Sequence, residues 1–211
     1  MGVSGIEVLS VVSAAASSTI TQDMDAFAGV TSVSIGNTNN EIVALTDVSA
    51  TMNTVKIVSA NTIAAGSSLT RKVDTTADSL TINMGAAAAG VTIVKFNASN
   101  EETVTINSSG GANVITNFNS ADMKSLTMTG SKSNVITNAI INAVTLATVD
   151  SSAATGNTTV NASNSTVALT MTGGTGIDTF TGAGGNDTLT GGAGNDVLSS
   201  GNGVNTINGG E

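Results

Sequence analysis

The sequence contains no Cys, His, Pro, Trp or Tyr, and only four Phe, among its 211 residues. Without His and Cys it lacks the commonest general base, the thiol nucleophile and the usual zinc or copper ligands. Without Cys it forms no disulfides, which fits both the cytosol and export routes that do not oxidise thiols. We therefore predict that the chain is not an enzyme.

Positive charge is also scarce, because 15 acidic residues stand against 6 basic ones and give a formal charge of −9. Such a chain repels phosphate backbones, so we expect no nucleic-acid partner. No Lys or Arg follows Ser133, whereas the acidic residues in that part are Asp150, Asp178, Asp187, Asp196 and Glu211. The C-terminal third therefore needs another source of positive charge.

Long apolar segments are missing as well. The stretch from Ile6 to Val12 is too short to span a bilayer, and Met1 is not followed by a recognisable secretory signal peptide. We expect no membrane span, and any export signal would lie outside this chain.

Short alternating segments recur before the C-terminal part of the chain, each with a hydroxyl, an apolar, a variable and an apolar residue. The copies are Ser32–Ile35, Thr54–Ile57, Ser79–Ile82, Thr103–Ile106 and Ser125–Met128, with weaker copies at Ala143–Leu146 and Val167–Thr170. Their recurrence at comparable but uneven intervals is typical of a repeat protein. The alternation buries one face of each strand and leaves the other face exposed to solvent.

We predict an all-β fold, in which residues 1–172 form a right-handed parallel β-solenoid. The absence of Pro favours this fold, because nearly every strand of a stacked coil is central and needs its N–H group. A β-sandwich of hairpins followed by a β-roll would use similar strand lengths and remains the alternative.

From Gly173 the repeat becomes a strict nonapeptide. The copies read GGTGIDTFT, GAGGNDTLT, GGAGNDVLS and SGNGVNTIN, followed by GGE at 209–211. Glycines let the turn aim its carbonyls at one point, and the apolar residue at the eighth position points into the core. These copies match the nonapeptide of RTX calcium-binding repeats. The chain thus resembles the RTX family, which implies a calcium-binding β-roll over residues 173–211.

If each nonapeptide is half a coil, side chains two nonapeptides apart lie one above the other. Asp178 then stacks on Asp196, and two carboxylates so close repel unless a cation lies between them. Carboxylate and carbonyl oxygens suit Ca²⁺. On the opposite edge Asp187 stacks on Asn205, which keeps an oxygen but loses a charge, so this site should be weaker.

The predicted calcium ligands are the side-chain or carbonyl oxygens of Gly173, Thr175, Asp178, Gly182, Gly184, Asp187, Gly191, Ala193, Asp196 and Asn205. Stepping back by the length of two nonapeptides from Asp178 and Asp187 reaches Val160 and Leu169, which cannot ligate. We therefore expect the calcium sites to begin at Gly173. Glu101 and Glu102 could be extra ligands, but we expect them in a solvated turn. The Arg71-Lys72 pair is too small to be a binding patch.

The acidic, Ser/Thr/Asn-rich array before the nonapeptides resembles calcium-dependent surface-layer proteins of Gram-negative bacteria. This resemblance implies an extracellular cell-surface location and self-association into a lattice (the S-layer), and the RTX resemblance implies type I secretion. Cell-surface polysaccharide, reached through regions outside this chain, is a second expected partner. The last copy stops in mid-repeat at Glu211, so we expect the chain to be part of a longer protein.

Two other functions stay open at this stage. The first is a calcium-rigidified adhesin or stalk, whose Ser/Thr rows could bind a glycan or ice. Uneven repeat spacing and Lys56 weigh against a flat ladder. The second is the accessory domain of a secreted enzyme.

Overall fold

The computed structural model describes residues 8–12, 19–27, 29–36, 42–58, 62–63, 67–85 and 90–211. Within them the chain forms two β-sheets and one short 3₁₀ helix, η1 (Met24–Ala26). Every described strand pair is parallel. The predicted parallel β-solenoid is thereby confirmed, because the hairpins of a sandwich would give antiparallel pairs.

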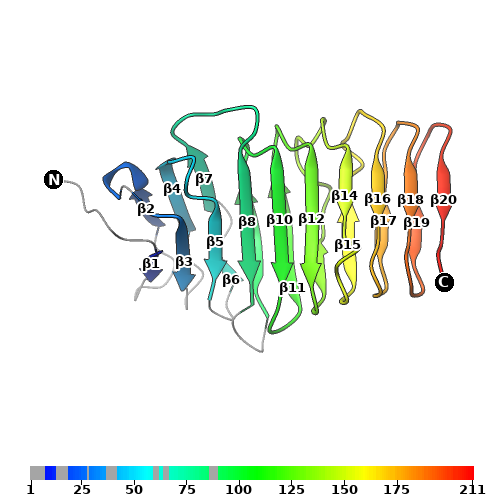
Figure 1. The fold of residues 1–211 in the computed structure, drawn as a ribbon, viewed down its shortest axis with the longest axis horizontal. Helices are drawn as coiled ribbons and strands as arrows, with labels where there is room; N and C mark the ends of the chain where they lie inside the picture. Colours follow the sequence, from blue (N-terminus) through cyan, green and yellow to red (C-terminus); the bar gives the residue numbers. More distant parts are fainter. Residues whose placement is uncertain are drawn as a thin grey trace.

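The strands stack along one axis, with the two sheets back to back (Figure 1). Sheet A follows the order β1 (Val8–Val12), β3 (Ser32–Gly36), β5 (Thr54–Ile57), β8 (Ser79–Met84), β10 (Thr103–Ser108), β12 (Ser125–Gly130), β14 (Thr148–Asp150), β16 (Thr170–Thr172), β18 (Thr188–Thr190) and β20 (Thr206–Asn208). Sheet B follows the order β2 (Thr19–Asp23), β4 (Ile42–Val48), β7 (Ser67–Arg71), β9 (Thr92–Asn97), β11 (Asn113–Asn119), β13 (Asn134–Ile136), β15 (Thr158–Asn161), β17 (Thr179–Thr181) and β19 (Val197–Ser199), and β6 (Thr62–Ile63) pairs with β9. No helix in the described ranges is long and apolar enough to cross a membrane.

Between β5 and β8 the register of sheet A shifts by two residues, because Thr54 pairs with Thr81, but from β8 onward the uneven repeat lengths do not disturb it. From β8 to β20 the first strand residues align in one row, which is Ser79, Thr103, Ser125, Thr148, Thr170, Thr188 and Thr206. The extra residues are therefore accommodated in the turns between the sheets.

The two weaker repeat copies were placed incorrectly by the sequence pattern. The strands lie at Thr148–Asp150 and Thr170–Thr172, whereas Ala143–Leu146 and most of Val167–Thr170 lie in turns. Leu146 and Leu169 are nevertheless buried. In these two segments, apolar and polar residues alternate because the turns bury some side chains against the edge of the core. A turn can therefore show the same alternation as a strand.

The core between the sheets is built from Val, Ile, Leu, Met and Ala, together with Phe96, Phe118 and Phe180. Phe96 and Phe118 stack with ring centroids 6.3 Å apart. At the eighth nonapeptide position Phe180 and Leu189 are fully buried, whereas Ile207, in the last strand of sheet A, is 52% exposed.

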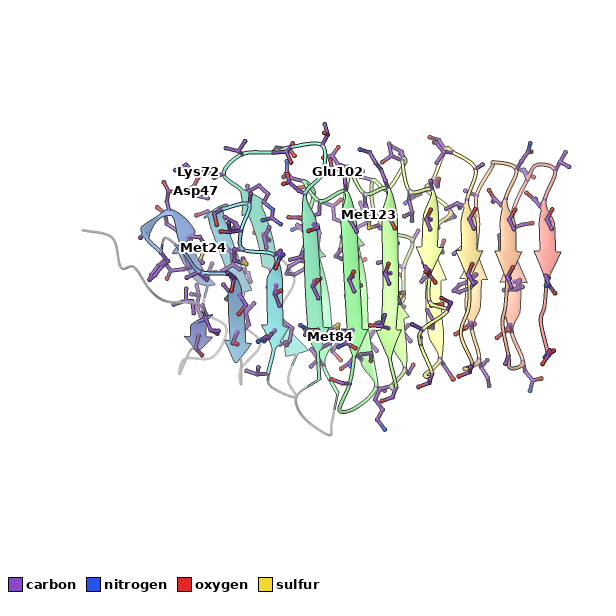
Figure 2. All side chains as sticks on the ribbon, viewed as in Figure 1. Met24, Asp47, Lys72, Met84, Glu102 and Met123 are labelled. Atoms are coloured by element: carbon purple, nitrogen blue, oxygen red, sulfur yellow. The ribbon has the colours of Figure 1, made fainter. Side chains whose placement is uncertain are left out.

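A buried ion pair contradicts the prediction that Glu101 lies in a solvated turn. Arg71 donates from Nε and Nη2 to the two carboxylate oxygens of Glu101, at 2.7 and 2.8 Å. Its remaining N–H groups reach the carbonyls of Ser49, Met52 and Ser79. Glu102 is buried too, and its carboxylate accepts the N–H of Asp78. In Figure 2, Glu102 lies at the upper edge of the coil and Met84 lies toward the lower edge. The charges were misassigned because their partners are distant in sequence.

Both sheets run without a break across the predicted division between residues 172 and 173. β16 ends just before Gly173 and pairs directly with β18 of the nonapeptide segment. On the other face, β15 pairs with β17 in the same way. The nonapeptides thus continue the coil of the preceding residues, and the division stays a prediction from sequence.

Candidate calcium sites

The nonapeptide turns alternate between the two edges of the flattened coil. Turns 173–178 and 191–196 follow strands of sheet A and lie at the lower edge in Figure 1. Turns 182–187 and 200–205 follow strands of sheet B and lie at the upper edge. Each turn therefore stacks on the turn two nonapeptides away.

The sixth positions of stacked turns are joined by hydrogen bonds. The N–H of Asp178 donates to Oδ1 of Asp196 at 2.8 Å, and the N–H of Asp187 donates to Oδ1 of Asn205 at 2.8 Å. The structure thus brings together both predicted side-chain pairs, one on each edge.

Asp178 is fully buried, with a side chain that faces backbone amides. Its Oδ1 accepts the N–H of Thr158 at 2.7 Å, and its Oδ2 accepts the N–H of Gly174 at 2.8 Å. Burial raises the pKa of the Asp178 carboxyl, although these hydrogen bonds lower it, and the nearby charge of Asp196 raises it further. The buried carboxylate therefore gains from an added positive charge.

Asp196 is less well satisfied. Its Oδ2 is inaccessible to solvent and has no hydrogen-bond partner in the described part of the chain. Neighbouring strands lie about 4.8 Å apart, which is roughly twice a Ca²⁺–oxygen distance of 2.3–2.6 Å. A calcium ion between the coils of Asp178 and Asp196 can therefore contact oxygens of both, so the residues fit this ion.

Backbone carbonyls would supply the remaining ligands of a bound calcium ion, since no three acidic side chains come together in the described residues. At the second position of each turn, the carbonyls of Gly174, Ala183 and Gly192 accept N–H groups of the next coil. The predicted ligands at positions one and three behave differently. No hydrogen bond within the described chain reaches the carbonyls of Gly173, Thr175, Gly182, Gly184, Gly191 or Ala193. These carbonyls are available to a cation.

In the three turns that end in Asp, the first glycine makes room for the carboxylate. A Cβ on Gly191 would lie 2.2 Å from Oδ2 of Asp196 and 2.4 Å from the carbonyl oxygen of Gly209. A Cβ on Gly173 would meet Oδ2 of Asp178 at 2.5 Å. Only glycine therefore allows the carboxylate to fold back over its own turn.

The prediction that Val160 lies beneath Asp178 is wrong. Thr159 pairs with Thr179, so the residue beneath Asp178 is Thr158. Thr158 and Asp178 are 20 positions apart in sequence, whereas Asp178 and Asp196 are 18 positions apart. The upstream coil is therefore longer than a pair of nonapeptides. On the other edge Leu169 lies beneath Asp187, as predicted, and its N–H donates to Oδ1 of Asp187 at 2.9 Å.

A weak motif in the sequence could have located Thr158. The segment AATGNT at 153–158 aligns with GGTGID at 173–178, with Thr-Gly at the same two positions. The structure stacks these turns, because a Cβ on Gly176 would lie 2.6 Å from the carbonyl carbon of Gly156. The two missing glycines and the missing Asp concealed the likeness.

Comparison with known proteins agrees with this geometry. The family model of the RTX calcium-binding nonapeptide repeat (4 copies) matches residues 171–211. Such repeats are typical of secreted, extracellular proteins. Searches of curated proteins and of solved structures found no significant match. Residues 171–211 are therefore RTX calcium-binding nonapeptide repeats, which continue the parallel β-solenoid as a β-roll.

Proposed function

We propose that this chain is a non-enzymatic, structural part of a calcium-dependent cell-surface protein that assembles into an S-layer lattice. The observation that carries this proposal is the outer face of sheet A. That face is long, regular and nearly uncharged, and it belongs to a coil whose end binds calcium.

The outer face carries two rows of short polar side chains from β8 to β20. The first row is Ser79, Thr103, Ser125, Thr148, Thr170, Thr188 and Thr206, and the second is Thr81, Thr105, Thr127, Asp150, Thr172, Thr190 and Asn208. Asp150 is the single charged member of these rows. Figure 2 shows short side chains on the strands of the front sheet.

The hydroxyls of these rows form no hydrogen bond with other groups in the described chain. They therefore remain available to a second molecule. Flat, uncharged faces let elongated molecules pack side by side without the repulsion that a net charge of −9 would otherwise cause.

Calcium couples folding of the nonapeptides to the surroundings. The turns are Gly-rich and carry buried carboxylates, so calcium binding contributes directly to their folding free energy. In this proposal the coil is loose where calcium is scarce and becomes a rigid lattice element outside the cell.

Electron microscopy and light scattering in excess calcium, and then after chelation, test the proposal. We expect ordered arrays that dissolve with the chelator. A Thr105→Lys/Thr127→Lys variant, charged on the outer face, should keep its calcium-dependent melting but lose the arrays. A chain that stays monomeric at all calcium concentrations would refute lattice assembly.

One observation favours the second candidate, a calcium-rigidified adhesin. The in-register rows from β8 to β20 form a regular ladder of hydroxyls about 4.8 Å apart. Such a ladder suits a ligand with its own repeat, such as a glycan or ice. Saturable binding of such a ligand by a stable monomer would favour the adhesin over the lattice.

A further inference from the structure

The calcium-binding edge continues upstream as a column of buried polar residues. The strand register aligns Asn113 with Asn134 and Asn134 with Thr158. Thr158 lies beneath Asp178, which lies beneath Asp196. Asn113, Thr158 and Asp178 are fully buried, and Asn134 is 2% exposed. Polar side chains therefore occupy the same place in five successive coils.

Unsatisfied atoms gather in this column. In the described residues, the buried side-chain atoms without a hydrogen-bond partner are Asn134 Oδ1, Thr158 Oγ1 and Asp196 Oδ2. All three are oxygens, and all three belong to the column. A buried oxygen without a partner costs stability, so a bound group is expected at each.

The Thr158 hydroxyl lies beside the carboxyl of Asp178. It is near enough to lower the pKa of that carboxyl, and its oxygen has no hydrogen-bond partner in the described chain. Two oxygens that lie close together without sharing a hydrogen bond can both face a cation.

The turn beneath Asp178 has the backbone pattern of a calcium-binding turn. The N–H of Thr175 donates to the carbonyl of Ala154 at 3.2 Å, just as the N–H of Ala193 donates to Gly174 at 2.9 Å. The carbonyl of Thr155, like that of Thr175 one coil further on, accepts no hydrogen bond from described groups. Turn 153–158 thus offers a carbonyl at the third position, as the nonapeptide turns do.

Pairs of neighbouring residues in the column, called steps here, differ in the number of carboxylates that they carry. The step from Asp178 to Asp196 has two carboxylates, the step from Thr158 to Asp178 has one, and the step from Asn134 to Thr158 has none. Each carboxylate oxygen has two lone pairs, and the N–H groups of Thr158 and Gly174 use one on each oxygen of Asp178. Asp178 can therefore ligate cations on both sides.

We propose that a further Ca²⁺ binds one step upstream of the nonapeptides, between Thr158 Oγ1 and the carboxylate of Asp178, with the carbonyl of Thr155. With one carboxylate instead of two, this site is weaker than the site of Asp178 and Asp196. The neutral step between Asn134 and Thr158 takes a buried water, because an uncompensated divalent charge is too costly there. The calcium column thus ends at Thr158.

Calorimetric titration of the full 211-residue chain with CaCl₂ tests this site. Thr158→Val removes the hydroxyl and keeps the shape, and it should bind one calcium ion fewer per chain. Thr158→Ser should keep the number of ions, since it retains the hydroxyl. Thr158→Asp should tighten the weak site at least about tenfold, because it adds a carboxylate. Thr159→Val, on the outer face of the same strand, is the matched control and should bind as the unaltered chain does.

Circular dichroism without calcium must show that Thr158→Val folds as Thr159→Val does. If it does not, the comparison of Thr158→Ser with Thr158→Asp carries the test. Unchanged stoichiometry in Thr158→Val, together with unchanged affinity in Thr158→Asp, would overturn the proposal. The result is independent of lattice formation, because a chain that binds this ion without forming arrays would refute only the proposed function.

Discussion

The N–H of Asp178 donates to Oδ1 of Asp196 at 2.8 Å, which locks the carboxylate of one coil onto the backbone of the coil before it. The other carboxylate oxygen of Asp196 is left without a partner in the described chain. We expect calcium to complete this arrangement of a half-satisfied carboxylate above a buried one.

Removing the Asp196 carboxylate should weaken calcium binding more than removing the side chain of Asn205 on the opposite edge. We expect Asp196→Ala to lose the tightest calcium binding and most of the calcium-induced rise in melting temperature. At a calcium concentration 100 times Kd, one site contributes about 2.7 kcal/mol. Calorimetry and thermal melting with and without calcium measure both effects. Asn205→Ala is the comparison, and an equal loss in the two variants would contradict the predicted difference between the edges.

Adding a carboxylate should strengthen the opposite edge. Asn205 already places Oδ1 2.8 Å from the N–H of Asp187. Asn205→Asp keeps this oxygen and adds a charge, so we expect at least about tenfold tighter calcium binding there. Without calcium the same variant should be less stable, because two carboxylates then repel each other. A variant more stable than the unaltered chain in chelator would argue against this pairing.

Two glycines allow a matched test of packing in the turns. Gly191→Ala places a Cβ 2.2 Å from Asp196 Oδ2. We therefore expect the free energy of unfolding to fall by at least about 2 kcal/mol and calcium binding to weaken. At Gly184 no atom lies within 4 Å of the added Cβ, and Gly184→Ala should change stability by less than about 1 kcal/mol. Chemical unfolding in calcium measures both, and equal losses would show that the close approach at Gly191 is unimportant.

The buried ion pair of Arg71 and Glu101 should affect the free energy of unfolding mainly because each charge neutralises the other. Arg71→Met leaves Glu101 as a buried, unpaired carboxylate, at a cost of about 3–5 kcal/mol. The double variant Arg71→Met/Glu101→Leu removes both charges and should recover much of this loss. Urea unfolding of the single and double variants measures the difference. A double variant as unstable as Arg71→Met would assign the loss to the carbonyls of Ser49, Met52 and Ser79 instead.

Calcium and protons should compete at Asp178. Its pKa in the calcium-free fold is raised above the ordinary 3.8, so the folded chain binds more protons than the unfolded chain just above that pH. Without calcium, this contribution to stability is complete below pH 3.8 and is lost as the pH rises through the folded pKa. With calcium, stability instead rises as the pH rises through this range, because the ion binds the ionised carboxylate. Unfolding free energies across this pH range, with Asp178→Asn as the control, test both signs.

Much of the fold was predictable because it depends on local periodicity. Alternation of apolar and polar residues gives strands with one buried face, and a nonapeptide period with glycines gives stacked turns. The pairing of Asp178 with Asp196 follows from the constant half-coil length of the nonapeptides. Upstream, coil lengths vary, so counting back by two nonapeptide lengths from Asp178 reached Val160 instead of Thr158.

The sequence by itself determined the all-β class, the nonapeptide turns, and calcium as the ion that these repeats bind, whereas the parallel strand pairing decided for the solenoid over the sandwich. Only the tertiary structure decided which residues from coils of unequal length lie above one another. It placed Arg71 against Glu101 and aligned Asn134, Thr158 and Asp178 in one buried column. The physical reason is that extra residues are absorbed in turns while strand hydrogen bonds hold the register, so spatial neighbours cannot be counted along the chain.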